Sequence, residues 1–165
     1  MSYALDFGTS NTLITRINPV TEQTEIIKLP VFCQQLGNNP PLIPSLLYVE
    51  NAHHPKILVG QEVSDRGLKL SNNPRFFSHF KRGIGSNIQG FLPELDGKTI
   101  TFEQVGEWFL TALIEQLKNE SATPIESLVL TVPVDSFEAY RHWLSQVCQG
   151  WNIEQIRLLD EPTAA

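Results

Sequence analysis

The sequence predicts an α/β fold in which helices flank a mixed β-sheet and a smaller α+β subdomain is inserted into it. Three observations support this fold class. The N-terminal part carries short strands joined by a glycine turn, the middle is rich in proline, and the last third alternates helix with strand. A chain of 165 residues with 41% hydrophobic residues is long enough to bury one sizeable core.

Three strands are expected in the N-terminal part. Residues 3–7 are typical of a buried strand, residues 12–17 are rich in β-branched side chains, and residues 24–29 alternate in hydropathy. The turn at residues 8–11 therefore joins strand to strand. It differs in this from Walker loops and Rossmann turns, both of which lead into a helix.

The middle of the chain, residues 30–98, predicts the inserted subdomain. Its short strand-like pieces are residues 46–49 and 57–59, and residues 61–70 predict a helix interrupted by Gly67. Prolines separate these pieces: Pro30, Pro40, Pro41, Pro44, Pro55, Pro74 and Pro93. The core of the fold is then expected from residues 1–29 together with 99–165.

Regular structure is expected again from residue 99. Residues 101–104 match a capping box. Apolar residues then recur at helical spacing: Val105, Trp108, Phe109, Ala112, Leu113 and Leu117. The apolar run 125–132 predicts a strand covered on both faces, and Pro133 ends it.

A second helix and a further strand are expected after Pro133. Asp135 or Ser136 is suited to cap the helix, and Gly150 to end it. One helix face is apolar: Phe137, Tyr140, Trp143, Leu144, Val147 and Cys148. Residues 156–159 predict the next strand, which gives a parallel pair with a right-handed crossover.

Composition narrows the function classes. The net charge of −6 argues against a nucleic-acid partner. No apolar run reaches the length of a membrane span, and the start lacks a signal-peptide pattern, so a cytoplasmic protein is expected.

Cys33 and Cys148 are expected to be reduced and buried, with a disulfide or a reactive thiol as alternatives. The four histidines lack zinc spacing.

The first candidate site lies at the glycine turn. Asp6 ends a strand and is suited to hold Mg²⁺ through water. Gly8, Thr9, Ser10 and Asn11 follow, and their amides and hydroxyls could surround a phosphate. An ordinary hairpin turn remains the alternative, because the same residue types are common in turns.

Two further segments carry candidate chemistry. Lys81 stands beside glycines and could reach a phosphate as a point charge, although the local pattern alone favours a solvated basic loop. Glu161 follows a parallel strand, where ligands of α/β sheets bind, and could orient a water; a helix start is the alternative. Pro133 and Arg141 by themselves suggest a strand terminator and a surface charge.

In order along the chain, these segments resemble the actin-like ATPase superfamily, of ribonuclease-H-like fold, and within it the DnaK-type heat-shock chaperones. The resemblance spans nearly the whole chain. It is carried by six segments, of which the last is the most specific: Asp6-Phe-Gly-Thr-Ser, Ile43-Pro-Ser, Val59-Gly-Gln-Glu, Phe80-Lys-Arg-Gly-Ile-Gly, Leu130-Thr-Val-Pro and Asp160-Glu-Pro-Thr-Ala-Ala.

The resemblance implies the nucleotide-binding half of a chaperone ATPase that uses ATP or ADP with Mg²⁺. Lys81 and Glu161 would be catalytic, and Asp6 would organise the metal's water shell. Pro133 and Arg141 would relay nucleotide state to a partner domain. K⁺ is less expected, because Asn11 stands where these chaperones often carry an aromatic residue.

Partners follow from the same resemblance. We expect a second lobe with its own phosphate loop, then co-chaperones and unfolded clients, in an intact protein that continues past Ala165. This chain alone is expected to bind ATP weakly and to turn over almost none. The alternatives are a sugar or acetate kinase, a filament-forming protein of the same superfamily, and a scaffold that has lost turnover.

Overall fold

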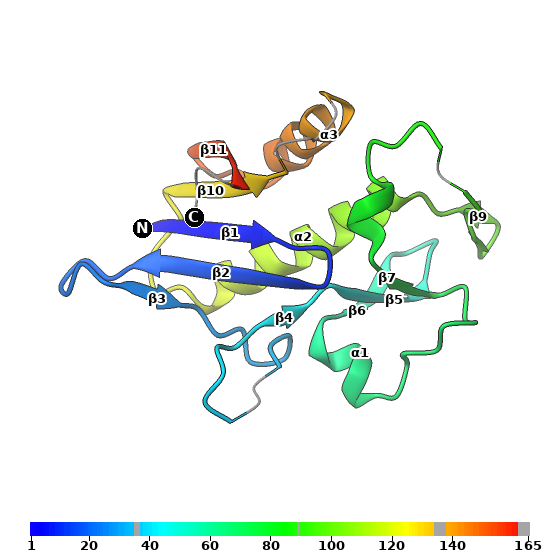
Figure 1. The fold of residues 1–165 in the computed structure, drawn as a ribbon, viewed down its shortest axis with the longest axis horizontal. Helices are drawn as coiled ribbons and strands as arrows, with labels where there is room; N and C mark the ends of the chain where they lie inside the picture. The colour runs from blue at the N-terminus through cyan, green and yellow to red at the C-terminus, as the bar shows by residue number, and fades with distance from the viewer. Residues whose placement is uncertain (35–36, 89, 134–137, 162–165) are drawn as a thin grey trace.

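The main sheet of the molecule has six strands and mixed direction (Figure 1). The computed structural model describes residues 1–34, 37–88, 90–133 and 138–161. The strand order is β11-β10-β1-β2-β3, with β4 paired to β2. The bounds are β1 (Ser2–Phe7), β2 (Asn11–Ile17), β3 (Thr24–Ile26), β4 (Ile43–Pro44), β10 (Ser127–Val132) and β11 (Gln155–Asp160).

The pairing follows from the sequence pattern. β1 and β2 form the expected antiparallel hairpin around the glycine turn. β1 pairs with β10 in parallel, and β10 pairs with β11 in parallel, so three strands end at the same edge of the sheet. The mixed α/β class is therefore confirmed. The third strand is shorter than the predicted residues 24–29. β3 lies at the edge of the sheet and ends at Ile26.

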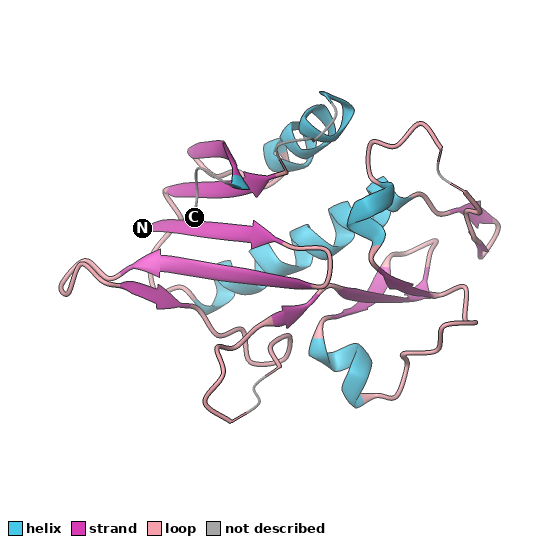
Figure 2. Cartoon of the chain, viewed as in Figure 1, coloured by secondary structure: helices cyan, strands magenta, loops and turns pink. Residues whose placement is uncertain are grey.

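Two helices cover one face of this sheet (Figure 2). α2 (Phe102–Glu120) begins at the predicted capping box: the Thr101 hydroxyl accepts from the Gln104 amide, and the Gln104 side chain accepts from the Thr101 amide. α3 (Glu138–Gln149) connects β10 to β11. Two indoles join α3 and the turn after it to α2, because Trp143 donates to the Glu103 carbonyl and Trp151 to the Thr111 hydroxyl.

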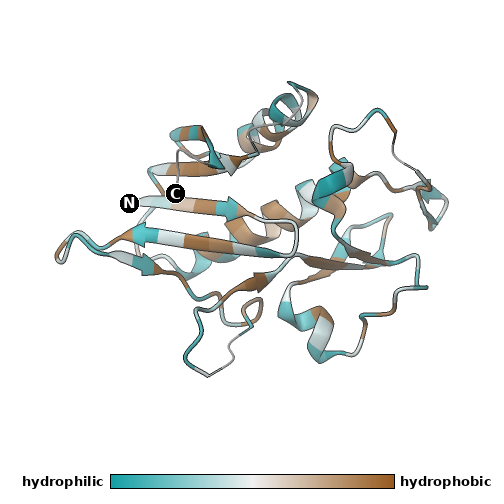
Figure 3. Ribbon diagram, in the orientation of Figure 1, coloured by the Kyte–Doolittle hydropathy of each residue, from teal (hydrophilic) through white to brown (hydrophobic). Residues whose placement is uncertain are grey.

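The core lies between the helices and the sheet. Figure 3 shows hydrophobic residues concentrated on the central strands and on α2. Along β1 every second side chain is buried, and Phe7 stacks on Phe109 of α2 with 5.8 Å between ring centroids. Phe80 meets Phe109 edge-on at 5.4 Å. These three rings connect the sheet, α2 and the middle of the chain.

The middle of the chain forms a second, three-stranded sheet. It contains β5 (Leu46–Asn51), β6 (Lys56–Val59) and β7 (Phe76–Ser78), in the order β6-β5-β7. The helix predicted over residues 61–70 was wrong in extent: α1 spans Gln61–Asp65 only. Gly67 adopts a φ of +68°, a left-handed conformation that ends helices, and the chain then turns away.

A hairpin of β8 (Glu94–Leu95) and β9 (Lys98–Thr99) is held to this second sheet by an ion pair and by hydrogen bonds to Ala52. Arg75 Nη2 lies 2.5 Å from Asp96 Oδ1, and the amide of Ala52 donates to Asp96 Oδ2 at 2.8 Å. The Arg75 guanidinium, assisted by this amide, lowers the pKa of Asp96 from 3.8 to about 2. The hairpin is thus attached through a carboxylate that must stay ionised.

We expect Asp96→Asn to flatten the pH dependence of stability in acid. A lowered carboxylate pKa stabilises the fold above the unfolded value, and this stabilisation is lost as pH falls from about 4 to about 2. The melting temperature of the wild-type chain should therefore fall more steeply over this range than that of the variant. Asparagine suits the φ of +53° at this position, so the backbone is preserved. Parallel pH profiles for the two proteins would contradict this prediction.

The two cysteines are free and buried, as predicted. Burial raises the pKa of the Cys33 thiol, and it raises that of Cys148 to about 12. A thiol in this state is a poor nucleophile, because the thiolate is the reactive form. Both side chains therefore act as buried, unreactive groups of the core, and the Cys33 sulfur accepts a hydrogen bond from the Leu29 amide at 3.2 Å.

Candidate functional site

A cavity of about 490 Å³ lies on the face of the main sheet opposite the helices. Strand alternation explains its position. Phe7 of β1 points to α2, so its neighbour Asp6 points to the other face. Residues from the first hairpin, from β10 and from two distant segments line it: Ala4, Leu5, Asp6, Gly8, Thr9, Leu13, Thr15, Lys81, Thr131 and Glu161.

Asp6 is held at the floor of this cavity. The Thr131 hydroxyl of β10 donates a hydrogen bond to Asp6 Oδ1 at 2.6 Å. β1 and β10 are parallel neighbours, so both residues lie near the carboxyl ends of their strands. The bond fixes the orientation of one carboxylate that faces the cavity.

The glycine turn is tightly built. A Cβ on Gly8 would lie 2.1 Å from the Asn11 carbonyl oxygen, so only glycine fits there. Ser45 supports the turn from behind: its hydroxyl donates to the Gly8 carbonyl at 2.8 Å, and its amide donates to the Ser10 carbonyl at 2.9 Å. The Thr12 hydroxyl lies 3.1 Å from that of Ser45. The turn is thus held in one conformation.

Lys81 is buried, with 9% of its surface exposed, so a solvated basic loop is the wrong interpretation. It lies in the 3₁₀ helix η1 (Phe80–Gly83). Its ammonium donates to the Phe7 carbonyl and to Glu161 Oε1, the latter at 3.0 Å. The same nitrogen lies 5.4 Å from the centroid of the Phe7 ring. These contacts direct the charge into the cavity.

Glu161 closes the cavity from the end of β11. Its side chain is 43% exposed and reaches Lys81 across 80 positions of sequence. The adjacent Asp160 pairs with Arg141 of α3, so Arg141 is no isolated surface charge. This ion pair ties α3 to the strand that carries Glu161.

The structure brings five of the predicted site residues to one cavity: Asp6, Gly8, Thr9, Lys81 and Glu161. Ser10 lies in the same turn and Asn11 is the first residue of β2, but both are exposed and do not line the cavity. Pro133 is half-buried just after β10. The predicted helix caps Asp135 and Ser136, and the apolar Phe137, lie outside the described residues.

Sequence reasoning assigned no role to Thr131, and it quoted Ser45 only as part of a motif. Thr131 has a weak sequence signal, being a hydroxyl near the end of an otherwise apolar run. The Phe7 carbonyl that accepts from Lys81 is a backbone group and has no sequence signal. The hydroxyls of Thr131 and Ser45 act by holding other groups of the site, namely the Asp6 carboxylate and the glycine turn.

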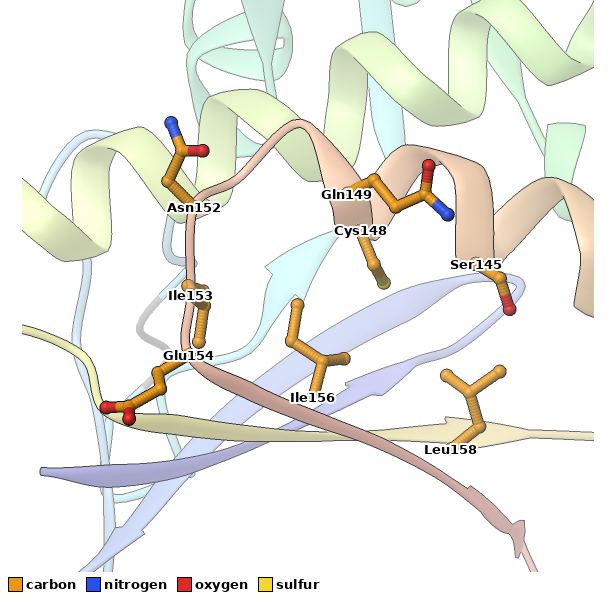
Figure 4. A pocket seen from close by; sticks show the side chains of 8 residues that line it. All are labelled: Ser145, Cys148, Gln149, Asn152, Ile153, Glu154, Ile156 and Leu158. Atoms are coloured by element: carbon orange, nitrogen blue, oxygen red, sulfur yellow. The ribbon is translucent and has the colours of Figure 1, made fainter.

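A second cavity, of about 310 Å³, lies between α3 and β11. Figure 4 shows Ile156 and Leu158 of β11 directed toward Cys148 on the helix. No predicted site residue lines it.

In the described ranges, His, Cys, Asp and Glu residues form no group of three or more that could hold a metal ion. The helices described here include none that is both long and apolar enough to cross a membrane.

Comparison with known proteins identifies one group of relatives, although no family model matches the chain. The chain is 27% identical over 174 residues to a chaperone protein HscA homolog of Rickettsia bellii. It is 24% and 22% identical to HscA homologs of Rickettsia felis and Shewanella denitrificans. Each similarity covers 100% of this chain.

The chain is similar to these chaperones over its whole length. It spans about a quarter of the length of the relatives it matches: 27%, 25% and 28%. The similarity is weak but supports the resemblance to the DnaK-type chaperone family noted in the sequence.

Proposed function

We propose that the chain is the first lobe of an actin-like nucleotide-binding domain, from a DnaK-like chaperone ATPase. Residues 1–29 and 99–165 would form the lobe and residues 30–98 its small subdomain. One observation carries the proposal: Asp6, Lys81 and Glu161, widely separated in sequence, line one cavity beside the glycine turn. The similarity to HscA chaperones supports the same assignment.

Each side chain has a role that its position supports. Lys81 would bind a terminal phosphate through an ammonium already aimed into the cavity by the Phe7 carbonyl. Gly8 and Thr9, with Ser10 and Asn11, would bind phosphate oxygens through the rigid turn. Glu161 would orient water from the opposite wall. Catalysis would then rest on positioning and charge stabilisation.

A magnesium ion fits the donor set. Asp6 and Glu161 offer the carboxylate oxygens that Mg²⁺ prefers, usually through its own waters. The ion would supply charge that offsets the phosphates. Thr131 would keep the Asp6 carboxylate oriented toward it. K⁺ remains a secondary proposal, for which the cavity offers no particular support.

The face of the sheet that carries the cavity is the natural place for a second lobe. The helices cover the opposite face, and among the described residues that line the cavity there is no aromatic side chain to hold an adenine. We propose that a second lobe supplies the adenosine contacts, and that Pro133 and Arg141 transmit nucleotide state. Arg141 is suited to this by its ion pair with Asp160, next to Glu161. Co-chaperones and unfolded clients belong to the same proposal.

We expect this chain to bind magnesium ATP weakly, through the phosphates. In an NMR titration, magnesium ATP should shift the amide signals of Gly8, Thr9 and Lys81. AMP, which lacks the β- and γ-phosphates, should leave them in place. The dissociation constant for magnesium ATP should be higher than micromolar, because under this proposal the cavity would hold only the phosphate side of a nucleotide. Micromolar affinity would contradict the half-site account, and unchanged signals would contradict nucleotide binding itself.

A further inference from the structure

Tyr140 carries a buried hydroxyl that the site as described does not use. The residue is 4% exposed, and its hydroxyl has no hydrogen-bond partner in the part of the chain that the structure describes. A buried hydroxyl without a partner destabilises a fold, and native proteins rarely retain one without reason. The group is therefore a candidate for a bond that forms in another state of the site.

The surroundings of Tyr140 hold its ring in place. A Cβ on Gly85 would lie 2.8 Å from the Tyr140 amide nitrogen, so the loop after Lys81 packs directly on the first turn of α3. The ring lies 5.5 Å from that of Trp143. The next residue, Arg141, is paired with Asp160. Tyr140 is thus fixed between the lysine loop and the end of β11.

The charged groups that act on the hydroxyl belong to the candidate site. Burial raises the pKa of Tyr140, and the negative charges of Glu161 and Asp6 raise it further. The phenol therefore stays protonated at all physiological pH values. The Arg141–Asp160 ion pair joins the residue after Tyr140 to the residue before Glu161, so this neutral donor lies on the same side of the site as the Glu161 carboxylate, which is an acceptor.

Glu161 is the carboxylate that can change its partner. It now pairs with Lys81 at 3.0 Å, and its side chain is 43% exposed, which leaves it room to rotate. A phosphate entering the cavity would compete for the Lys81 ammonium, because lysine binds phosphate as a point charge. The Glu161 carboxylate would then need a new donor.

We propose that Tyr140 is a positioning residue: when a phosphate engages Lys81, its hydroxyl donates a hydrogen bond to the Glu161 carboxylate and holds it at the cavity wall. The proposal rests on the proposed nucleotide function of this cavity. It gives a reason for keeping a buried hydroxyl that has no partner among the described residues.

The test compares two tyrosines. Tyr3 is also 4% exposed, but its hydroxyl lies 3.0 Å from Ser121 Oγ, at the other end of β1 from Asp6. Tyr3→Phe should therefore lower the melting temperature of the free chain, whereas Tyr140→Phe should not. In NMR titrations with magnesium ATP, Tyr140→Phe should weaken binding by about three- to tenfold, the range of one neutral hydrogen bond. Tyr3→Phe should leave affinity unchanged.

A double substitution tests whether Tyr140 acts through Glu161. In a Glu161→Ala background, Tyr140→Phe should cause no further loss of affinity. An equal loss in both backgrounds, or wild-type affinity of Tyr140→Phe alone, would overturn this inference and leave the nucleotide function standing. Absence of magnesium ATP binding by the wild-type chain would reject both proposals. A fall in the free-chain melting temperature of Tyr140→Phe as large as that of Tyr3→Phe would also overturn it.

Discussion

Replacing Lys81 with alanine is expected to lower single-turnover ATP hydrolysis by roughly a hundredfold or more, in a longer protein that joins this chain to a second lobe. Losing a preorganised charge at a developing transition-state charge costs on this order. Lys81 is 9% exposed and held by the Phe7 carbonyl and Glu161, so its ammonium is already in place before a ligand binds. Glu161→Ala should cause a loss of the same order.

Lys56→Ala is the matched control for Lys81→Ala. Lys56 also pairs with a glutamate at 3.0 Å, Glu50, but its side chain is 74% exposed and lies outside the cavity. Its removal should leave the hydrolysis rate unchanged, because exposed ion pairs contribute little. If the lysine acts mainly in the transition state, Lys81→Ala should change the affinity for magnesium ATP less than it changes the hydrolysis rate. Equal rates for Lys81→Ala and the wild-type protein would reject the catalytic role and favour a scaffold that has lost turnover.

The parts of the fold that depend on local chemistry could be predicted from the sequence. The capping box at residues 101–104 sets the start of α2 through side chains four positions apart or fewer. The glycine turn is similarly local, since Gly8 and Asn11 meet within one hairpin. The interruption predicted at Gly67 within residues 61–70 is also local, since Gly67 adopts a left-handed φ of +68°, but the helix ends at Asp65 and does not resume.

The candidate site depends on contacts that no local pattern contains. Lys81 and Glu161 meet across 80 positions, and Asp6 meets Thr131 across 125. The local pattern of a lysine beside glycines suggested a solvated basic loop, yet Phe80 is buried in the core and brings Lys81 inward while Arg82 stays exposed. Only the order of the motifs, through the family resemblance, placed these residues together.

Tyr140 shows a different limit of sequence reasoning. Its position on the apolar face of α3 predicted a core residue, and the ring is indeed buried. Periodicity describes the ring but not the hydroxyl, which is buried without a hydrogen-bond partner among the described residues. A polar atom at the tip of an apolar side chain can therefore belong to a site that hydropathy assigns to the core.

Replacing Phe109 with alanine is expected to lower the free energy of unfolding by about 3–5 kcal/mol, the usual cost of removing a buried phenyl ring. Phe109 is fully buried and contacts Phe7 at 5.8 Å and Phe80 at 5.4 Å between centroids. A loss of this size is a large part of the total stability of a domain. Urea denaturation measures it, and Phe91→Ala is the control, because Phe91 is 87% exposed and should change stability by about 0.5 kcal/mol or less.

The same substitution should also weaken the candidate site. Phe7 precedes Gly8, and Phe80 precedes Lys81, so both site segments rest on the ring of Phe109. The void left by the missing phenyl ring beneath these two segments would let the Lys81 ammonium move away from the Phe7 carbonyl. We therefore expect Phe109→Ala to lose the amide shifts caused by magnesium ATP even in conditions where the variant is fully folded. Phe109→Leu, which leaves a smaller void, should retain part of both stability and binding. Full binding by a folded Phe109→Ala variant would show that the turn and the lysine are held without the aromatic cluster.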